Sequence, residues 1–353
     1  MTNLSIDQLL KYSLDSGASD LHLSVGSIPR IRIHGEMHKL QLPPLDDAMM
    51  DSIMREVMNE NQEKNFKANL EIDFSTALEG HGRFRVNFFH QMDGLGGVFR
   101  TIPSEILSIE ELGLVPFLNN LALRDRGLIL LTGPTGSGKS TTLAAMIDFI
   151  NDQRQCHIIT IEDPVEYYHK SKNSLINQRE IGAHTHSFSN ALRSALREDP
   201  DVILLGEMRD LETIQLALTA AETGHLVLST LHTSSAAKTI DRIIDVFPSG
   251  QKDQIRSMLS ESLIAVIAQK LLATKNKDGR VPASEILVAN SAVRNLIRED
   301  KIYQIPSILQ AGGTEGMQTL DQDLQRLLMQ GLVSREDVMQ IADNPEVFSR
   351  GLY

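Results

Sequence analysis

Cysteine and tryptophan are almost missing from this 353-residue chain, which contains Cys156 as its one cysteine and no tryptophan. A single cysteine excludes a disulfide within the chain and any zinc site built from several cysteines. No window approaches the roughly 18 consecutive apolar residues that indicate a membrane-spanning helix, so we expect no direct membrane insertion. The N-terminal stretch carries acidic residues and no apolar segment typical of a secretory signal, which predicts a cytoplasmic protein.

Positive charge is also scarce, because 34 lysines and arginines stand against 46 aspartates and glutamates, for a net charge of −12. Nucleic acids and anionic lipids bind cationic surfaces, so neither is expected as the main partner. The hydrophobic share of 41% and the charged share of 23% are ordinary for a globular protein. The length allows two or three domains.

A glycine-rich stretch matches the phosphate-binding pattern G-x-x-x-x-G-K-[ST] between Gly133 and Ser140. The apolar run 128–131 before it predicts a buried strand, and apolar residues at helical spacing after it predict a helix. Strand, glycine loop and helix form the context that this pattern needs, so we favour nucleotide binding over a simple glycine-rich turn. The predicted ATP-binding residues are Gly133, Pro134, Thr135, Gly136, Ser137, Gly138, Lys139, Ser140 and Thr141.

Each part of this loop has a predicted role. Its glycines allow the backbone to wrap a polyphosphate with the N–H groups pointing inward. The positive end of the following helix faces the same anion. Lys139 is predicted to reach the β- and γ-phosphates of ATP, and the Ser140 hydroxyl to bind Mg²⁺.

Apolar runs alternate with amphipathic segments from residue 117 onward, which predicts a parallel sheet covered by helices on both faces. The predicted strands are 128–132, 157–161, 202–205 and 226–230. Ligands bind beyond the carboxyl ends of the strands in such sheets, so the polar residues after each run are predicted to converge. After residue 240 mostly helices are expected, including a long amphipathic stretch over 251–272.

Carboxylates follow two of these strands. Glu162 and Asp163 are predicted to lie on the metal side of the site, and Glu166 to act as general base. Glu207 is predicted to position water and contact the metal, while the opposite allocation of Glu166 and Glu207 remains open. The structural alternative for Glu207 is an ion pair with Arg209.

Two further residues bear on the chemistry. Gly206 stands where the aspartate that binds Mg²⁺ usually follows the apolar run. His232 lies beyond the end of the last predicted strand, at the place where a sensor of the γ-phosphate is expected, and we favour that role over a structural one.

The first hundred residues predict a small mixed α/β domain. Arg83 and Arg85 alternate with apolar residues in a predicted strand. Arg100 lies on the strand that returns after a predicted turn at Gly94, Gly96 and Gly97. The three arginines are therefore predicted to share one sheet face, either as a solvated surface or in contact with a phosphate.

Several segments resemble the motifs of the secretion-superfamily ATPases, the motors of type II secretion and type IV pili. The segment 196–210, which includes Gly206 and Glu207, is similar to the family's signature, and the Gly206 departure is itself typical. Segments 158–166 and 225–233 resemble its aspartate and histidine boxes. Segments 18–24 and 291–299 are similar to elements of the family's pilus-retraction branch.

The resemblance implies an N-terminal PAS-like domain over 1–100, a hinge linker over 101–116, a RecA-like ATPase core over 117–273 and a C-terminal helical region over 274–353. It also implies a ring-shaped homohexamer that hydrolyses ATP with Mg²⁺ and retracts pili. The implied partners are an inner-membrane pilus platform protein at the pilus base and a paralogous motor subunit. The alternative is a nucleotide-gated accessory subunit of another pilus motor.

Overall fold

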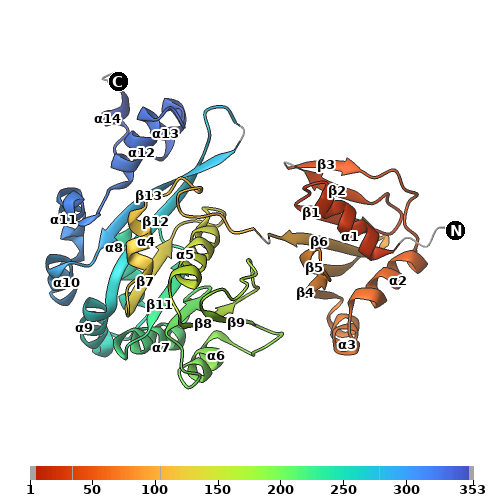
Figure 1. Cartoon of the computed structure of the whole chain (residues 1–353), viewed down its shortest axis with the longest axis horizontal. Coiled ribbons are helices and arrows are strands. Elements are labelled where there is room, and N and C mark those ends of the chain that lie inside the picture. Colours follow the sequence, from red (N-terminus) through yellow and green to blue (C-terminus); the bar gives the residue numbers. More distant parts are fainter. Residues whose placement is uncertain (1–4, 34, 104, 278, 350–353) are drawn as a thin grey trace. The chain divides into compact units, whose positions relative to one another are not determined.

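The computed structural model describes residues 5–33, 35–103, 105–277 and 279–349 (Figure 1). Residue 104 of the predicted linker, and residues 278 and 350–353 of the predicted C-terminal region, lie outside these ranges. The chain forms two compact units. The first contains Met1–Glu105 together with Glu166–Tyr168, and the second contains Ile106–Val165 and His169–Tyr353.

The first unit is built on an antiparallel sheet with the strand order β3-β2-β1-β6-β5-β4. One face of this sheet packs against helices α1 to α3 and buries aliphatic and phenylalanine side chains such as Leu21, Phe84 and Phe99. The elements are α1 (Ile6–Asp15), β1 (Asp20–Ser24), β2 (Arg30–Ile33), β3 (Glu36–Lys39), α2 (Asp47–Val57), α3 (Glu60–Asn69), β4 (Glu71–Leu78), β5 (Gly82–Gln91) and β6 (Gly94–Ile102).

The second unit is built on a mostly parallel sheet with the order β13-β12-β7-β11-β10-β8-β9. Strands β9, β8, β10, β11, β7 and β12 pair in parallel, and β13 joins the edge antiparallel to β12. The strands are β7 (Gly127–Thr132), β8 (His157–Glu162), β9 (Leu175–Glu180), β10 (Val202–Leu205), β11 (Leu226–Leu231), β12 (Leu263–Ala273) and β13 (Arg280–Val288).

Helices cover both faces of this second sheet (Figure 1). Alternate residues of β7 point to the two sides, so Leu128 packs with one hydrophobic cluster and Ile129 with the other. The helices are α4 (Phe117–Ala122), α5 (Lys139–Gln153), α6 (Phe188–Ala195), α7 (Leu211–Glu222), α8 (Ala236–Asp245), α9 (Lys252–Ser262), α10 (Ser291–Arg298), α11 (Ile305–Ala311), α12 (Leu320–Met329), α13 (Arg335–Ile341) and α14 (Glu346–Ser349).

These two sheets confirm the predicted α/β fold class, with a mixed N-terminal domain and a parallel-sheet core followed by helices. The four predicted core strands are all present, as β7, β8, β10 and β11. Among the described residues, no helix is long and apolar enough to cross a membrane.

The prediction of mostly helices after residue 240 is wrong between Leu263 and Val288. The helix α9 ends at Ser262, and β12 and β13 follow as a long antiparallel pair at the edge of the core sheet. The segment over 263–272 is apolar at most positions because both faces of β12 are buried, and such a run gives no period-2 signal.

The predicted turn at the glycines of the N-terminal hairpin is also partly wrong. Gly94, Gly96 and Gly97 all lie inside β6, and Gly97 pairs with Phe88 of β5. A Cβ atom at Gly97 would lie 2.7 Å from the ring of Phe88, which is fully buried in the core of the first unit. Glycine is therefore needed here to leave room for an aromatic ring, not to turn the chain.

We expect Gly97→Ala to lower the free energy of unfolding by about 1–3 kcal/mol, because the added methyl group overpacks the Phe88 site. Urea unfolding followed by circular dichroism measures this change. The control is Gly250→Ala, because a Cβ atom there has no neighbour within 4 Å. Equal unfolding midpoints for the two variants would show that the Phe88 ring adapts without cost.

Candidate nucleotide-binding site

The predicted phosphate-binding loop joins the end of β7 to the start of α5. Gly138 caps the helix in a left-handed conformation, with φ of 85°, and no side chain caps the first turn. The first N–H groups of a helix are an anion-binding site when no side chain occupies them. No side chain therefore competes with an anion for the backbone donors at the start of α5.

Lys139 is held inside this loop. Its side chain is largely buried, and Nζ donates hydrogen bonds to the carbonyl oxygens of Gly133 at 2.9 Å and Pro134 at 3.0 Å. A bound polyphosphate offers charged acceptors at the same location. The lysine can therefore exchange two backbone acceptors for phosphate oxygens with little movement of its stem.

Threonine hydroxyls connect the end of β7 to the end of β11. Thr132 donates to the carbonyl oxygen of Thr233 at 2.6 Å and accepts a hydrogen bond from the Thr233 N–H at 2.9 Å. The Thr233 hydroxyl also lies 2.6 Å from the hydroxyl of Thr239 in α8. The residue before the phosphate-binding loop is thus fixed to the residue that follows His232.

Glu207 and His232 lie side by side at this edge of the sheet. His232 Nε2 is 3.5 Å from Glu207 Oε2, and the Glu207 side chain is 17% exposed. Arg209 Nε lies 2.5 Å from the other carboxylate oxygen, so the ion pair of the structural alternative is also formed. The structure therefore brings together two of the residues that were predicted to act on the γ-phosphate.

A lack of space for a side chain does not explain the glycine at position 206. A Cβ atom there would meet the Glu162 Cα and the Ile161 carbonyl oxygen at 3.4 Å, which is ordinary van der Waals contact. Its carbonyl oxygen accepts a 2.6 Å hydrogen bond from the Thr230 hydroxyl of β11. This bond ties the segment that carries Glu207 to β11, the strand that precedes His232.

The three carboxylates of the 158–166 segment lie in different surroundings. Glu162 is buried at the end of β8, where it accepts hydrogen bonds from Thr160 at 2.7 Å and Gln178 at 3.3 Å. Asp163 is exposed, and Glu166 groups with the first unit. Neighbours in the sequence thus differ in burial and in partners.

The predicted metal ligands Ser140, Glu162, Asp163 and Glu207 form no preformed cage. Across the described ranges, no group of three or more histidine, cysteine, aspartate or glutamate side chains is arranged to hold a metal ion. Mg²⁺ in nucleotide sites usually keeps several water molecules and takes one or two protein ligands along with phosphate oxygens. The predicted ligands all offer oxygen atoms, the donor type that Mg²⁺ takes in such sites.

The three arginines share one face of the first sheet, as predicted. Arg85 lies directly opposite Arg100 in the β5–β6 pair, and Arg83 lies two residues before Arg85. Arg85 forms an ion pair with Asp73, and Arg83 lies over the ring of Tyr168, 5.3 Å from its centroid.

Asp20 neutralises part of the charge on this face. It accepts a 2.8 Å hydrogen bond from Arg100 and lies 3.9 Å from Arg32. Burial acts to raise the pKa of Asp20, but hydrogen bonds from Arg100 and Ser19 and the nearby positive charges outweigh it and lower the pKa. The carboxylate therefore stays ionised and paired.

Gln269 of β12 is a site residue that the sequence reasoning missed. Its side chain contacts the phosphate-binding loop at Ser137 and the helix α5 at Thr142. It was missed because the stretch that contains it was predicted to be helical. A polar residue inside a long apolar run was the only available signal.

Comparison with known proteins shows the family of the chain. The type II/IV secretion system protein family matches residues 2–340. The chain belongs to this family. The family resemblance inferred from the motifs is thereby confirmed.

Individual members of the type II/IV secretion family are similar over nearly the whole chain. It is 56% identical over 345 residues to the type IV pilus retractation ATPase PilT of Pseudomonas aeruginosa, covering 98% of this chain and 100% of that protein. It is 59% identical over 321 residues to a twitching motility protein of Neisseria gonorrhoeae, covering 91% and 86% of the two chains.

A solved structure agrees with these relatives. The crystal structure of the pilus retraction motor PilT with bound ADP superimposes with a TM-score of 0.92 at 48% identity, and covers 98% of this chain and 99% of that chain. The fold described above is therefore the fold of a protein crystallised with a nucleoside diphosphate.

His169 is a buried histidine beside the 158–166 segment. Its backbone N–H donates to Gln178, the residue that also binds Glu162, and its Nδ1 is buried with no hydrogen-bond partner. Burial lowers the pKa of His169 to about 4, and the charges of Asp148 and Lys172 oppose each other. The folded protein therefore holds this imidazole neutral.

We expect His169 to make the protein acid-sensitive. His169 binds a proton near pH 6.5 in the unfolded chain and near pH 4 in the folded chain. Its protonation therefore stabilises the unfolded chain as the pH falls from 6.5 toward 4, and the free energy of unfolding decreases over that range. His169→Gln should reduce the loss of unfolding free energy between pH 7 and pH 5 by about 2 kcal/mol.

Urea unfolding at the two pH values measures this effect. The control is His186→Gln, which changes an exposed histidine of the same unit and should leave the acid sensitivity at the parent level. An unchanged pH dependence in His169→Gln would show that His169 does not cause the loss.

Proposed function

We propose that this chain is an ATP-hydrolysing motor that powers the retraction of type IV pili. The proposal is supported by relatives named as a retractation ATPase and a twitching motility protein, and by a similar structure that holds ADP. The observation that carries the catalytic part is the placement of Glu207 beside His232, next to the loop that holds Lys139. An accessory subunit that only binds nucleotide would not need this pair.

The phosphate chain of ATP binds to residues 133–141, through backbone N–H groups of the loop, where Pro134 offers none, and of the first turn of α5. Lys139 leaves the carbonyl oxygens of Gly133 and Pro134 and binds the β- and γ-phosphates. Mg²⁺, when bound with ATP, neutralises charge on the phosphate oxygens. Ser140 would hold the ion directly, and Glu162, Asp163 and Glu207 would hold it partly through water.

Hydrolysis needs a water molecule in line with the γ-phosphate and a group that accepts its proton. Glu207 positions this water, and His232 senses the γ-phosphate while its neighbour Thr233 keeps it in register with the loop. Glu166 acts as general base. Removal of its carboxylate in Glu166→Gln would then leave nucleotide binding intact and slow turnover.

The motor is a homohexamer in the cytoplasm, peripheral to the inner membrane at the pilus base, with a platform protein of that membrane as its partner. Nucleotide lies between neighbouring subunits, and Arg83, Arg85 and Arg100 approach its phosphates. The linker over 101–116 acts as the hinge between the two units. A paralogous motor subunit is a further partner in this arrangement.

We expect Lys139→Ala to lose ATP binding and Glu207→Gln to bind ATP but hydrolyse it about 10²–10⁴-fold more slowly. The reason is that Lys139 compensates phosphate charge in the bound state, whereas Glu207 acts on the water. Steady-state phosphate release and equilibrium binding of an ATP analogue measure the two effects separately.

The matched control is Glu212→Gln, which changes an exposed glutamate of α7 and should keep the parent rate. In a strain that lacks the chain, only variants that hydrolyse ATP should restore pilus retraction. Turnover at the parent rate in Glu207→Gln would refute the site. Normal retraction in the deletion strain would favour the accessory role.

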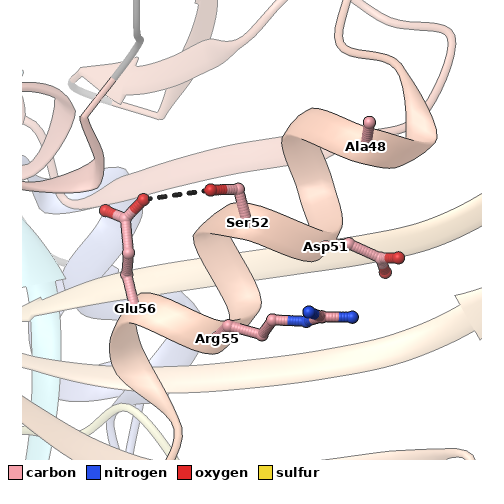
Figure 2. Close-up of a pocket in the computed structure, with 5 residues that line it drawn as sticks. All are labelled: Ala48, Asp51, Ser52, Arg55 and Glu56. Carbon is pink, nitrogen blue, oxygen red and sulfur yellow. Dashed lines mark hydrogen bonds between the residues drawn. The ribbon is translucent and has the colours of Figure 1, made fainter.

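We expect alanine at Arg83, Arg85 or Arg100 to lower turnover by about 10³-fold or more where that arginine contacts a transferring phosphate, with ATP binding largely kept. The control is Arg55→Ala on α2 of the same unit, where the side chain lines a pocket together with Asp51 and Ser52 (Figure 2). Because Asp20 loses a partner in Arg100→Ala, unfolding is measured in parallel. Turnover at the parent rate in all three variants would show that these arginines form only a solvated sheet face.

A further inference from the structure

Gln269 lies in β12, the strand next to β7, and its side chain is almost fully buried. Its Nε2 donates a 2.7 Å hydrogen bond to the carbonyl oxygen of Ser137 within the phosphate-binding loop. Its Oε1 accepts a 2.8 Å hydrogen bond from the Thr142 hydroxyl in the first turns of α5. One amide group therefore joins the loop to the helix that follows it.

The loop also packs closely on this residue. A Cβ atom at Gly133 would collide with the backbone carbonyl oxygen of Gln269, and one at Gly138 would lie 2.8 Å from Gln269 Nε2. Both glycines have positive φ, at 146° and 85°. The glycines thus serve the contact with β12 as well as the approach of a phosphate.

The position of Gln269 is itself fixed from the opposite side. Gln269 pairs in register with Ser284 of β13, and the Ser284 N–H donates a 2.8 Å hydrogen bond to the buried carboxylate of Asp323 in α12. Asp323 forms an ion pair with Arg326 at 2.7 Å. The strand behind the loop is therefore anchored in the C-terminal part of the chain and does not follow the loop freely.

We propose that Gln269 is a positioning residue that holds the phosphate-binding loop in its nucleotide-binding shape and thereby sets the affinity for nucleoside di- and triphosphates. The proposal rests on the proposed ATPase function. The Ser137 carbonyl oxygen is held away from the phosphates by the Gln269 amide, so the loop N–H groups face the nucleotide. Without this bond, the entropic cost of ordering the loop falls on nucleotide binding, which weakens the affinity but leaves the rate of hydrolysis of bound ATP nearly unchanged.

Two substitutions separate the role of the amide from its volume. Gln269→Met keeps the length of the side chain but removes both hydrogen bonds. Gln269→Glu keeps the acceptor for Thr142 and removes the donor to Ser137, and its charge repels phosphate. The matched control is Gln318→Met, because the Gln318 amide donates to the Ser284 carbonyl oxygen at 2.9 Å and not to the loop.

The test measures the Kd of ADP by calorimetry, the KM and kcat for ATP, and urea unfolding, all on the full chain. We expect about a tenfold rise in Kd and KM for Gln269→Met, with kcat within about threefold of the parent. Gln269→Glu should bind ADP more weakly still, and Gln318→Met should bind like the parent. A purely structural role would instead lower the unfolding midpoint and leave Kd and KM of the folded protein unchanged.

Parent values of Kd and KM in Gln269→Met would overturn the proposal, as would an equal rise in Gln318→Met. If Gln269→Met does not fold, Thr142→Val replaces it, since this variant removes only the bond that orients the amide and should weaken ADP binding about threefold. An unchanged Kd in Thr142→Val would then overturn the proposal. A parent chain that binds ADP but does not hydrolyse ATP would refute the proposed function instead, and the Kd comparison would still decide the role of Gln269.

Discussion

The pair of hydrogen bonds between Thr132 and Thr233 is the constraint on which the candidate site depends. Thr132 ends β7 and precedes the phosphate-binding loop, while Thr233 follows β11 and His232. Two neighbouring parallel strands would end near each other in any case. The threonine bonds fix how far each chain segment runs beyond the sheet before it turns. A polar group acting on a phosphate needs placement finer than strand pairing alone provides.

The core strands were predictable because each is a short apolar run between polar segments, and each is buried on both faces. Val202–Leu205 was predicted with its exact bounds. The strand β12 was not predictable, because the run Leu263–Ala273 continues directly from a helix without a turn residue. Only its pairing with β7 and β13 decides its structure.

Dependence on distant parts of the chain also separates the site residues that could be predicted from those that could not. The phosphate-binding loop is contiguous, so its glycines, lysine and serine form a recognisable pattern within the eight residues 133–140. Gln269 acts on Ser137 across 132 residues, and Thr132 acts on Thr233 across 101 residues. Nearness in the sequence also misleads, since Glu162 is buried at the end of β8 while Glu166 groups with the other unit.

The arginine face shows how a local arrangement can oppose the overall charge. The chain carries a net charge of −12, yet Arg85 and Arg100 stand directly opposite each other on two paired strands. Like charges in this position destabilise a sheet unless each has a partner. Arg85 engages Asp73 through more than one nitrogen, whereas Arg100 engages Asp20 through Nε and is 66% exposed. Contact with a further anion would therefore disturb fewer existing bonds at Arg100 than at Arg85.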